Sequence, residues 1–354
     1  MDTQTYCLLG GPGSPYSLKL RAALRYRRLP HVWVVPQSYI GGGDSELARA
    51  GKNMIPNLRL PEDGTYWADT TPILYALEAR HPGQRSLLPD DPADAFLAHL
   101  IDDFADELLV NVLFTYRWGF AADLEFCPRR QLSGWLGAMP TADFEKTVQV
   151  FRQRQVDNLN RMGPRDIVLP LYEHVYFELL AIIERLLTES RYFFGSRPSL
   201  GEIGLFGQLS QCAIDPTASQ LMKQRAPRAF QWVQDLDDAS GIDGEWRGPA
   251  SPPPAALKDL LRLVAGIYLP FAAAHADALM RDATQVDTTI AGKRFAGAVN
   301  PYTARCLLWL KDEYAKLDAA ARQRVNTLLD NADAVGLLKF AEGEAALVPP
   351  HVPV

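Results

Sequence analysis

The sequence predicts an α/β domain, then an all-helical domain, then further helices at the C-terminal end. In the first 88 residues, short apolar runs typical of strands alternate with helical patterns. From residue 92 to about 239, apolar residues recur at helical spacing and no strand pattern competes with them. We therefore expect an α/β domain over residues 1–88, an all-helical domain over 89–245 and a helical extension over 255–345.

The N-terminal elements are expected in the order strand, helix, strand, short helix, strand, strand, helix. They comprise residues 5–10, 16–28, 31–36, a short stretch after the glycines at 41–43, and residues 55–60, 66–68 and 71–80. The first strand ends at the Gly10–Gly13 loop. Leu18 and Ala22 mark the apolar face of the first helix, which Pro30 ends. Glu62–Gly64 is a turn signal between the last two strands.

Helical patterns continue through the rest of the chain. In the middle they cover residues 92–119, 141–162, 169–190, 199–213 and 226–239. Residues 241–254 are rich in glycine and proline and have the composition of a linker. Beyond this linker, residues 255–282 and 301–342 are expected to form three more helices, because they are too apolar for a disordered tail.

Composition limits the classes of function. The 354 residues are 47% apolar and 22% charged, as in a soluble globular protein, and the net charge of -6 argues against a nucleic-acid partner. The four cysteines form no CxxC pair and the histidines no HxH or HxxxH pair, so no metal site is expected. The N-terminus lacks a secretion signal, and no apolar run reaches the ~18 residues of a membrane helix. We expect a cytoplasmic protein with no membrane partner.

Ser14 lies where the first strand passes into the first helix, and its simplest role is to cap that helix. The segment from Ser14 to Arg21 also resembles the active-site motif of serine-type glutathione S-transferases. In that family the matching hydroxyl donates a hydrogen bond to the glutathione sulfur. Lowering a thiol pKa from about 8.5 to about 6.5 takes about 2.7 kcal/mol, which one charge-assisted hydrogen bond and a helix N-terminus can supply. The resemblance implies that Ser14 is catalytic, with Ser17 as a nearby alternative.

Two further segments carry the same resemblance. The family has a cis peptide before the proline that matches Pro56, so the backbone of Ile55 would pair with the cysteinyl part of glutathione. Asp69 and Thr70 stand where the family has an acidic residue or glutamine followed by serine, which bind the γ-glutamyl end at a helix N-terminus. The aspartate side chain of Asp69 is shorter than glutamate or glutamine, so the sequence leaves open whether it reaches the glutathione amino group. By themselves, these residues are also typical of a helix cap followed by Pro72.

Ser199 and Glu202 have the spacing of a capping box. This segment resembles the folding motif of the transferase helical domain, which usually has aspartate where Glu202 stands. The resemblance covers about residues 5–240. It implies a thioredoxin-like N-terminal domain followed by an all-α glutathione transferase C-terminal domain with extra C-terminal helices, and it has no counterpart for residues 255–354.

A pocket for a second substrate is expected beside Tyr16 and the end of the helix near 94–118. That helix end carries Phe114, Tyr116, Arg117, Trp118 and Phe120, of which Tyr116, Arg117 and Trp118 are the main candidates. Aromatic side chains there would hold an electrophile, and Arg117 would attract an acidic ligand or a glutathione carboxylate. The alternative is that these aromatic residues belong to the core.

The resemblance implies a homodimeric transferase with glutathione as co-substrate, which activates the thiol for attack on a small apolar electrophile. The alternative is a non-catalytic glutathione-binding or protein-interaction module on the same fold, which suits the long extension. A glutathione-dependent disulfide reductase would need a cysteine where Ser14 stands. The sequence does not identify the electrophile.

Overall fold

The computed structural model describes residues 5–36, 46–51, 54–83 and 85–354. Its N-terminal domain contains a four-stranded sheet with the order β2-β1-β3-β4. The strands are β1 (Tyr6–Leu9), β2 (His31–Val34), β3 (Asn57–Arg59) and β4 (Tyr66–Ala68). β1 pairs parallel with β2 and antiparallel with β3, and β3 pairs antiparallel with β4. The helices of this domain are α1 (Pro15–Tyr26), α3 (Glu46–Ala50) and α4 (Thr70–Arg80).

This order of elements confirms the predicted thioredoxin-like domain. β1 is buried along its whole length, because Leu8 belongs to the same hydrophobic core as Leu18 of α1. α1 begins at Pro15, a residue that suits a first helical turn, directly after the capping residue Ser14. The expected glycine loop at 41–43 lies outside the described residues.

The second domain is helical, as predicted. A continuous run is formed by α5 (Pro92–Phe104), the π-helical turn η1 (Ala105–Leu109) and α6 (Val110–Gly119). It is followed by α7 (Ala121–Leu136), α8 (Thr141–Met162), α9 (Arg165–Glu189), α10 (Leu200–Cys212), α11 (Pro216–Arg225) and α12 (Pro227–Leu236). The sequence did not predict α7 or α11. Pro128 and Gly134 interrupt the pattern of α7, and α11 is short and mostly polar.

The capping box at the start of α10 is confirmed. The Ser199 N–H donates to a Glu202 carboxylate oxygen over 2.8 Å, and the Ser199 hydroxyl oxygen accepts from the Gly201 N–H over 3.2 Å. α10 then lies between α1 and α5 and contacts both. The box therefore fixes the start of the helix that joins the two domains.

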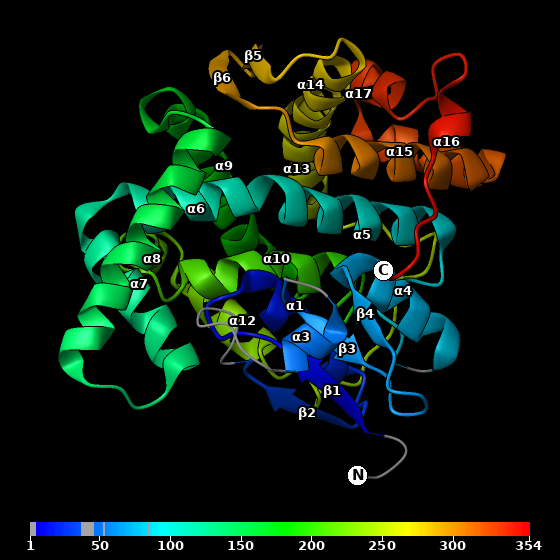
Figure 1. Cartoon of the computed structure of the whole chain (residues 1–354). Helices are drawn as coiled ribbons and strands as arrows, with labels where there is room; N and C mark the ends of the chain where they lie inside the picture. Colours follow the sequence, from blue (N-terminus) through cyan, green and yellow to red (C-terminus); the bar gives the residue numbers. More distant parts are fainter. Residues whose placement is uncertain (1–4, 37–45, 52–53, 84) are drawn as a thin grey trace.

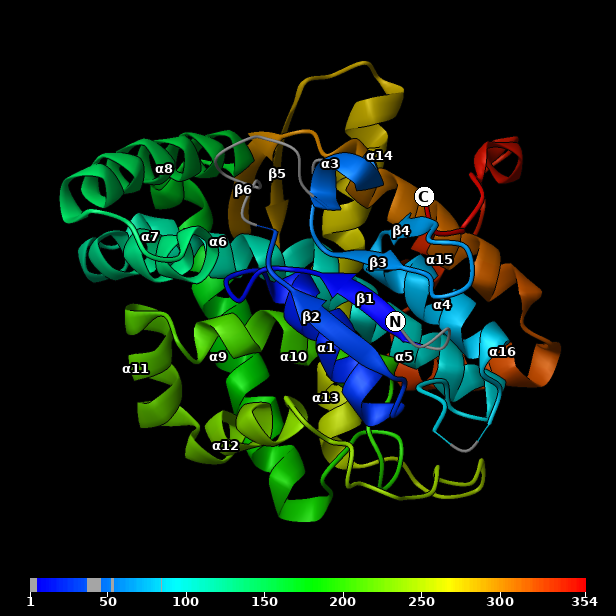
Figure 2. The same ribbon diagram turned by 60° about the horizontal axis from the view of Figure 1, so that its bottom comes forward.

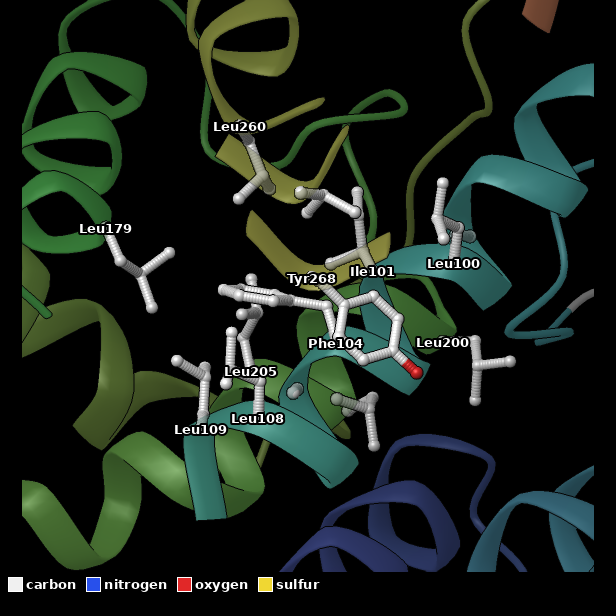
Figure 3. Packing of buried hydrophobic residues seen from close by; sticks show 14 of the residues in the cluster. Leu100, Ile101, Phe104, Leu108, Leu109, Leu179, Leu200, Leu205, Leu260 and Tyr268 are labelled. Atoms are coloured by element: carbon white, nitrogen blue, oxygen red, sulfur yellow. The ribbon is translucent and has the colours of Figure 1, made fainter. Parts of the chain in front are cut away.

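The extension shares the hydrophobic core of the helical domain. Figure 3 shows Tyr268 of the extension next to Phe104 of the central run. Leu260 of the extension, Leu108 of the central run and Leu205 of α10 belong to the same hydrophobic cluster. All five side chains are fully buried. The extension is therefore an integral part of the fold.

The elements of the extension are partly those predicted. They are α13 (Ala255–Leu263), the π-helical turn η2 (Val264–Tyr268), α14 (Leu269–Met280), β5 (Gln285–Ile290), β6 (Lys293–Ala298), α15 (Pro301–Lys316), α16 (Ala319–Leu329), α17 (Ala332–Leu337) and η3 (Glu344–Leu347). The expectation of helices alone was wrong, since β5 and β6 form an antiparallel hairpin. Val286, Ile290 and Phe295 are buried side chains of this hairpin, and Ala291 and Gly292 turn the chain at positive φ.

The helical run Ala255–Met280 is long and apolar enough to cross a membrane by length and composition alone. In this structure 56% of its apolar window is buried inside the protein. α13 packs against α9, and α14 packs against α15. The run thus serves as a core helix of the extension.

The extension also reaches the N-terminal sheet. α15 runs beside α5, and α5 lies between α15 and α1 (Figure 1). The C-terminal segment then descends past α4 to β4, and both views place it there (Figures 1 and 2). The Ala68 N–H donates to the Val354 oxygen over 2.7 Å, and the Val354 N–H donates to the Ala68 oxygen over 3.3 Å. The tail therefore pairs with the free edge of β4.

Candidate active site

A cavity of about 440 Å³ lies between the N-terminal domain, the α5–α6 run and the extension. The structure brings all four predicted glutathione-binding residues to its wall, together with Tyr16, which was predicted for the second-substrate pocket. The sequence-predicted residues that line it are Tyr16, Ile55, Pro56, Asp69 and Thr70. They come from three separate segments of the N-terminal domain, so the fold alone assembles them.

The peptide bond between Ile55 and Pro56 is cis, as the resemblance implied. It lies directly before β3, where the Asn57 side chain donates to the Met54 oxygen over 2.5 Å. Among the described residues, none pairs with the backbone N–H or C=O of Ile55. These backbone groups remain available to an extended peptide.

Asp69 and Thr70 stand at the N-terminal end of α4. The Asp69 backbone has φ 76°, and its side chain does not cap the helix. Its carboxylate instead accepts a hydrogen bond from the Tyr302 hydroxyl of α15. Burial raises the pKa of Asp69, while the Tyr302 hydrogen bond lowers it. The Thr70 hydroxyl points toward Asp106, with 3.5 Å between the oxygens.

Ser14 is half-buried and caps α1, since its hydroxyl oxygen accepts from the Ser17 N–H over 3.2 Å. Ser14 does not line the 440 Å³ cavity, but its loop borders Ile55: a Cβ built on Gly11 would lie 3.0 Å from the Ile55 Cδ1. Ser17 is fully buried and its hydroxyl accepts from the Gly11 N–H over 3.2 Å. Ser14 is therefore the more accessible of the two predicted hydroxyls.

The structure does not bring Tyr116, Arg117 and Trp118 into the cavity. All three are at most 2% exposed. Tyr116 belongs to the main core, and Trp118 to a second hydrophobic cluster. The Arg117 guanidinium pairs with Asp215 over 2.6 Å and donates to the Gly13 oxygen over 2.9 Å. Arg117 thus joins the loop before Ser14 to Asp215, the residue that precedes α11.

A buried ion cluster lies behind Asp69 and Thr70. Lys19 is fully buried and pairs with Asp102 and Asp106, each over 2.6 Å. The Lys19 ammonium also donates to the Thr71 hydroxyl oxygen over 3.0 Å. Burial lowers the pKa of Lys19, but the two carboxylates outweigh that effect and raise it. The cluster anchors the start of α4 to α1 and to the central helical run.

Two other acidic residues of the central run line the cavity. Asp103 accepts a hydrogen bond from the Tyr268 hydroxyl, and Glu107 accepts one from Thr303 over 2.6 Å. Burial raises the pKa of Asp103 to about 7 and that of Glu107 to about 8, with neighbouring carboxylates adding to both. Both hydroxyl donors come from the extension. Sequence reasoning missed these acids, although their clustering within an apolar helix was a usable signal.

α15 and the tail form the opposite wall of the cavity. Tyr302, Arg305 and Trp309 line it from α15, and the Trp309 indole donates to the Pro349 oxygen over 2.8 Å. His351 stacks on Trp309 with 4.2 Å between ring centroids. Burial lowers the pKa of His351 to about 4 and that of the neighbouring His99 to about 3, so both rings are neutral at pH 7.

A second cavity, of about 450 Å³, adjoins the first. The two share Val110 and Asn300 in their walls. Its aromatic lining is Phe114 of α6 with Phe271 and Phe295 of the extension. Phe114 belongs to the aromatic group that was expected to hold an electrophile. The rest of this cavity was not predicted, because half of its wall belongs to a region where only helices were expected.

Comparison with known protein families gives two matches, one to each of the first two domains of this chain. The N-terminal domain of glutathione S-transferases matches residues 8–85, and the C-terminal domain of the same family matches residues 174–235. Over these residues the chain matches both domains of the glutathione S-transferase family, which supports its place in that family. A comparison with curated proteins found no match.

Several solved structures are similar to this chain at low sequence identity. The β-etherase LigF from Sphingobium sp. strain SYK-6 is 20% identical with a TM-score of 0.47, over 72% of this chain and 98% of its own. A glutathione S-transferase from Methylobacterium radiotolerans, in complex with glutathione sulfonate, is 20% identical with a TM-score of 0.42, over 70% and 98%. A Tau class enzyme from mango, Mangifera indica, is 16% identical with a TM-score of 0.40, over 67% and 90%. At TM-scores below 0.5, nothing about activity follows from them.

Proposed function

We propose that this protein is a glutathione transferase of the serine type. Glutathione would lie along the 440 Å³ cavity, with its cysteinyl backbone against Ile55 and its γ-glutamyl end at Asp69 and Thr70. The observation that carries this proposal is the unpaired backbone of Ile55 in the same cavity wall as the N-terminus of α4. A peptide with a negatively charged end fits these two features together.

The Ser14 hydroxyl is the proposed donor to the sulfur. It stands at the N-terminus of α1, where the helix dipole favours an anion, and its loop borders Ile55. In the proposed reaction the thiol loses its proton to solvent, the thiolate forms a bond to an electrophilic carbon, and the leaving group departs with its electron pair. Ser14 contributes by favouring the thiolate over the thiol.

The second cavity is the proposed place of the electrophile. Its lining by Phe114, Phe271 and Phe295 favours a small apolar or aromatic compound. Since it adjoins the glutathione cavity at Val110, the two substrates would meet near that residue. This assignment replaces Tyr116 and Trp118, which are buried.

The proposed setting is a homodimer in the cytoplasm. The extension already covers α5 and the edge of β4, so a second subunit would use other faces. Light scattering of the purified full chain measures the molar mass directly. A mass of one chain, 39.3 kDa, would contradict the dimer.

Two measurements test the activity. Calorimetric titration with glutathione measures binding, and a conjugation assay with a chlorinated dinitrobenzene measures turnover by absorbance. We expect both to be positive. Binding without turnover over a broad panel of electrophiles would instead favour the non-catalytic module, and absence of binding would overturn the proposal.

A further inference from the structure

Arg305 is a cation in the cavity wall that no family match covers. It lies on α15, outside residues 8–85 and 174–235. Its guanidinium lies 5.6 Å from the Tyr302 ring centroid and 5.7 Å from that of Trp309. Such cation–π contacts hold a guanidinium in place without neutralising its charge. Within the described residues, no ion pair or hydrogen bond engages Arg305.

The wall of the same cavity also includes a carboxylate with one oxygen that accepts no hydrogen bond from the described residues. Asp106 is 7% exposed and lines the cavity from η1. Its Oδ2 accepts from Lys19 over 2.6 Å, but its Oδ1 has no hydrogen-bond partner among the described residues. A buried carboxylate oxygen without a partner is costly, so the site favours a ligand that donates to it.

Positive and negative groups therefore face one space at the start of α4. Arg305 and the helix N-terminus attract an anion, while Asp106 and Asp69 attract a cation. A free α-amino acid group carries an ammonium and a carboxylate on one carbon atom. The cavity matches this zwitterion better than it matches either charge alone.

We infer that Arg305 of the extension binds the α-carboxylate of the γ-glutamyl end of glutathione, while the Asp106 Oδ1 accepts from its ammonium. This inference rests on the proposed function. It gives the extension a direct role in ligand binding: residues 301–309 complete a site that the two family domains leave open. A guanidinium pairs with a carboxylate through two parallel hydrogen bonds, so lysine would replace arginine only in part.

The test is calorimetric titration of the full chain and its Arg305→Gln variant with three peptides. The first is glutathione, the second is γ-aminobutyryl-cysteinylglycine, which lacks the α-carboxylate, and the third is glutathione amidated at its glycine. We expect Arg305→Gln to weaken glutathione about tenfold or more, and Arg305→Lys to weaken it less. We expect the same loss with the amidated peptide. Both proteins should bind the decarboxylated peptide equally weakly.

The control is Arg281→Gln, at an exposed arginine of the extension whose side chain donates to the backbone oxygen of Asp277, away from the cavity lining. It should bind all three peptides as the wild type does. If wild type binds glutathione and Arg305→Gln binds it equally well, this inference is overturned while the proposed function stands. If wild type and Arg305→Gln bind the amidated peptide equally well, Arg305 contacts the glycine carboxylate of glutathione and not the α-carboxylate. That result would also overturn the inference. If the wild-type protein does not bind glutathione, both this inference and the proposed function are overturned.

Discussion

The Tyr302 hydroxyl donates a hydrogen bond to the carboxylate of Asp69, which joins the extension to the start of α4. These residues are far apart in the sequence and belong to different parts of the protein. Both residues line the 440 Å³ cavity, so their contact joins the wall formed by the N-terminal domain to the wall formed by the extension. The extension therefore contributes to this cavity as well as to the core.

Replacement of Asp69 by asparagine should weaken glutathione binding about tenfold, because the ammonium loses one charged partner. Asparagine tolerates the backbone at φ 76° and still accepts a hydrogen bond from Tyr302. Calorimetric titration measures the effect. The matched control is Asp330→Asn, an exposed aspartate with φ 47° at the end of α16, which should change nothing. Equal affinities for the two variants would contradict a role for the Asp69 charge.

Removal of the Ser14 hydroxyl should raise the pKa of the bound glutathione thiol by about 1–2 units, the equivalent of one charge-assisted hydrogen bond. Ser14→Ala also loses the cap of α1, which costs about 1 kcal/mol of stability. Ser14→Asn keeps the cap and removes the hydroxyl, so it separates the two effects. The thiolate absorbance, titrated against pH, reports the pKa. Ser133→Ala on the exposed face of α7 is the control, and an unshifted titration in both Ser14 variants excludes Ser14 as the donor.

Stability should fall as pH rises toward 8, because burial raises the pKa of Glu107 to about 8 from its usual 4.5. Between these values the folded chain keeps a proton that the unfolded chain has lost. The free energy of unfolding should therefore decrease by up to about 1.4 kcal/mol per pH unit in this window and level off above it. Asp103, whose pKa is raised to about 7, adds to the same trend.

Glu107→Gln should flatten this dependence, since glutamine accepts from Thr303 without titrating. Melting temperatures from pH 5 to 9 measure it. The variant should gain stability relative to wild type as pH rises. Glu342→Gln, at an exposed position of the tail, should follow the wild-type curve. A wild-type curve that is flat over this range would refute the buried neutral carboxyl.

Gly11→Ala should destabilise the loop before Ser14 by about 1–3 kcal/mol. A Cβ there would lie 2.2 Å from the Trp135 ring nitrogen, and the ring or the loop must move. We expect a lower melting temperature together with weaker glutathione binding. Gly336→Ala in α17, where a Cβ meets nothing within 4 Å, should be neutral or slightly stabilising. Equal melting temperatures for the two variants would show that the loop adapts.

Local patterns were enough for the N-terminal domain. The apolar runs and the turn at Glu62–Gly64 predicted its strands and helices, and the sequence resemblance placed the cis bond before Pro56. The hairpin at 285–298 was missed because its alternation is carried by few residues, Val286 and Ile290 among them. Arg117 was assigned to a pocket because the sequence does not show that α11 places Asp215 against it.

The sequence by itself determined the order of elements, the family of the two domains and the positions of Ser14, Ile55, Asp69 and Thr70 in that order. These features depend on periodicity, caps and turns, which act between residues close in the chain. Only the tertiary structure decided that Asp106, Tyr302 and Arg305 share one cavity with them. The physical reason is that burial and charge pairing act through space, so they depend on how the extension packs against α5.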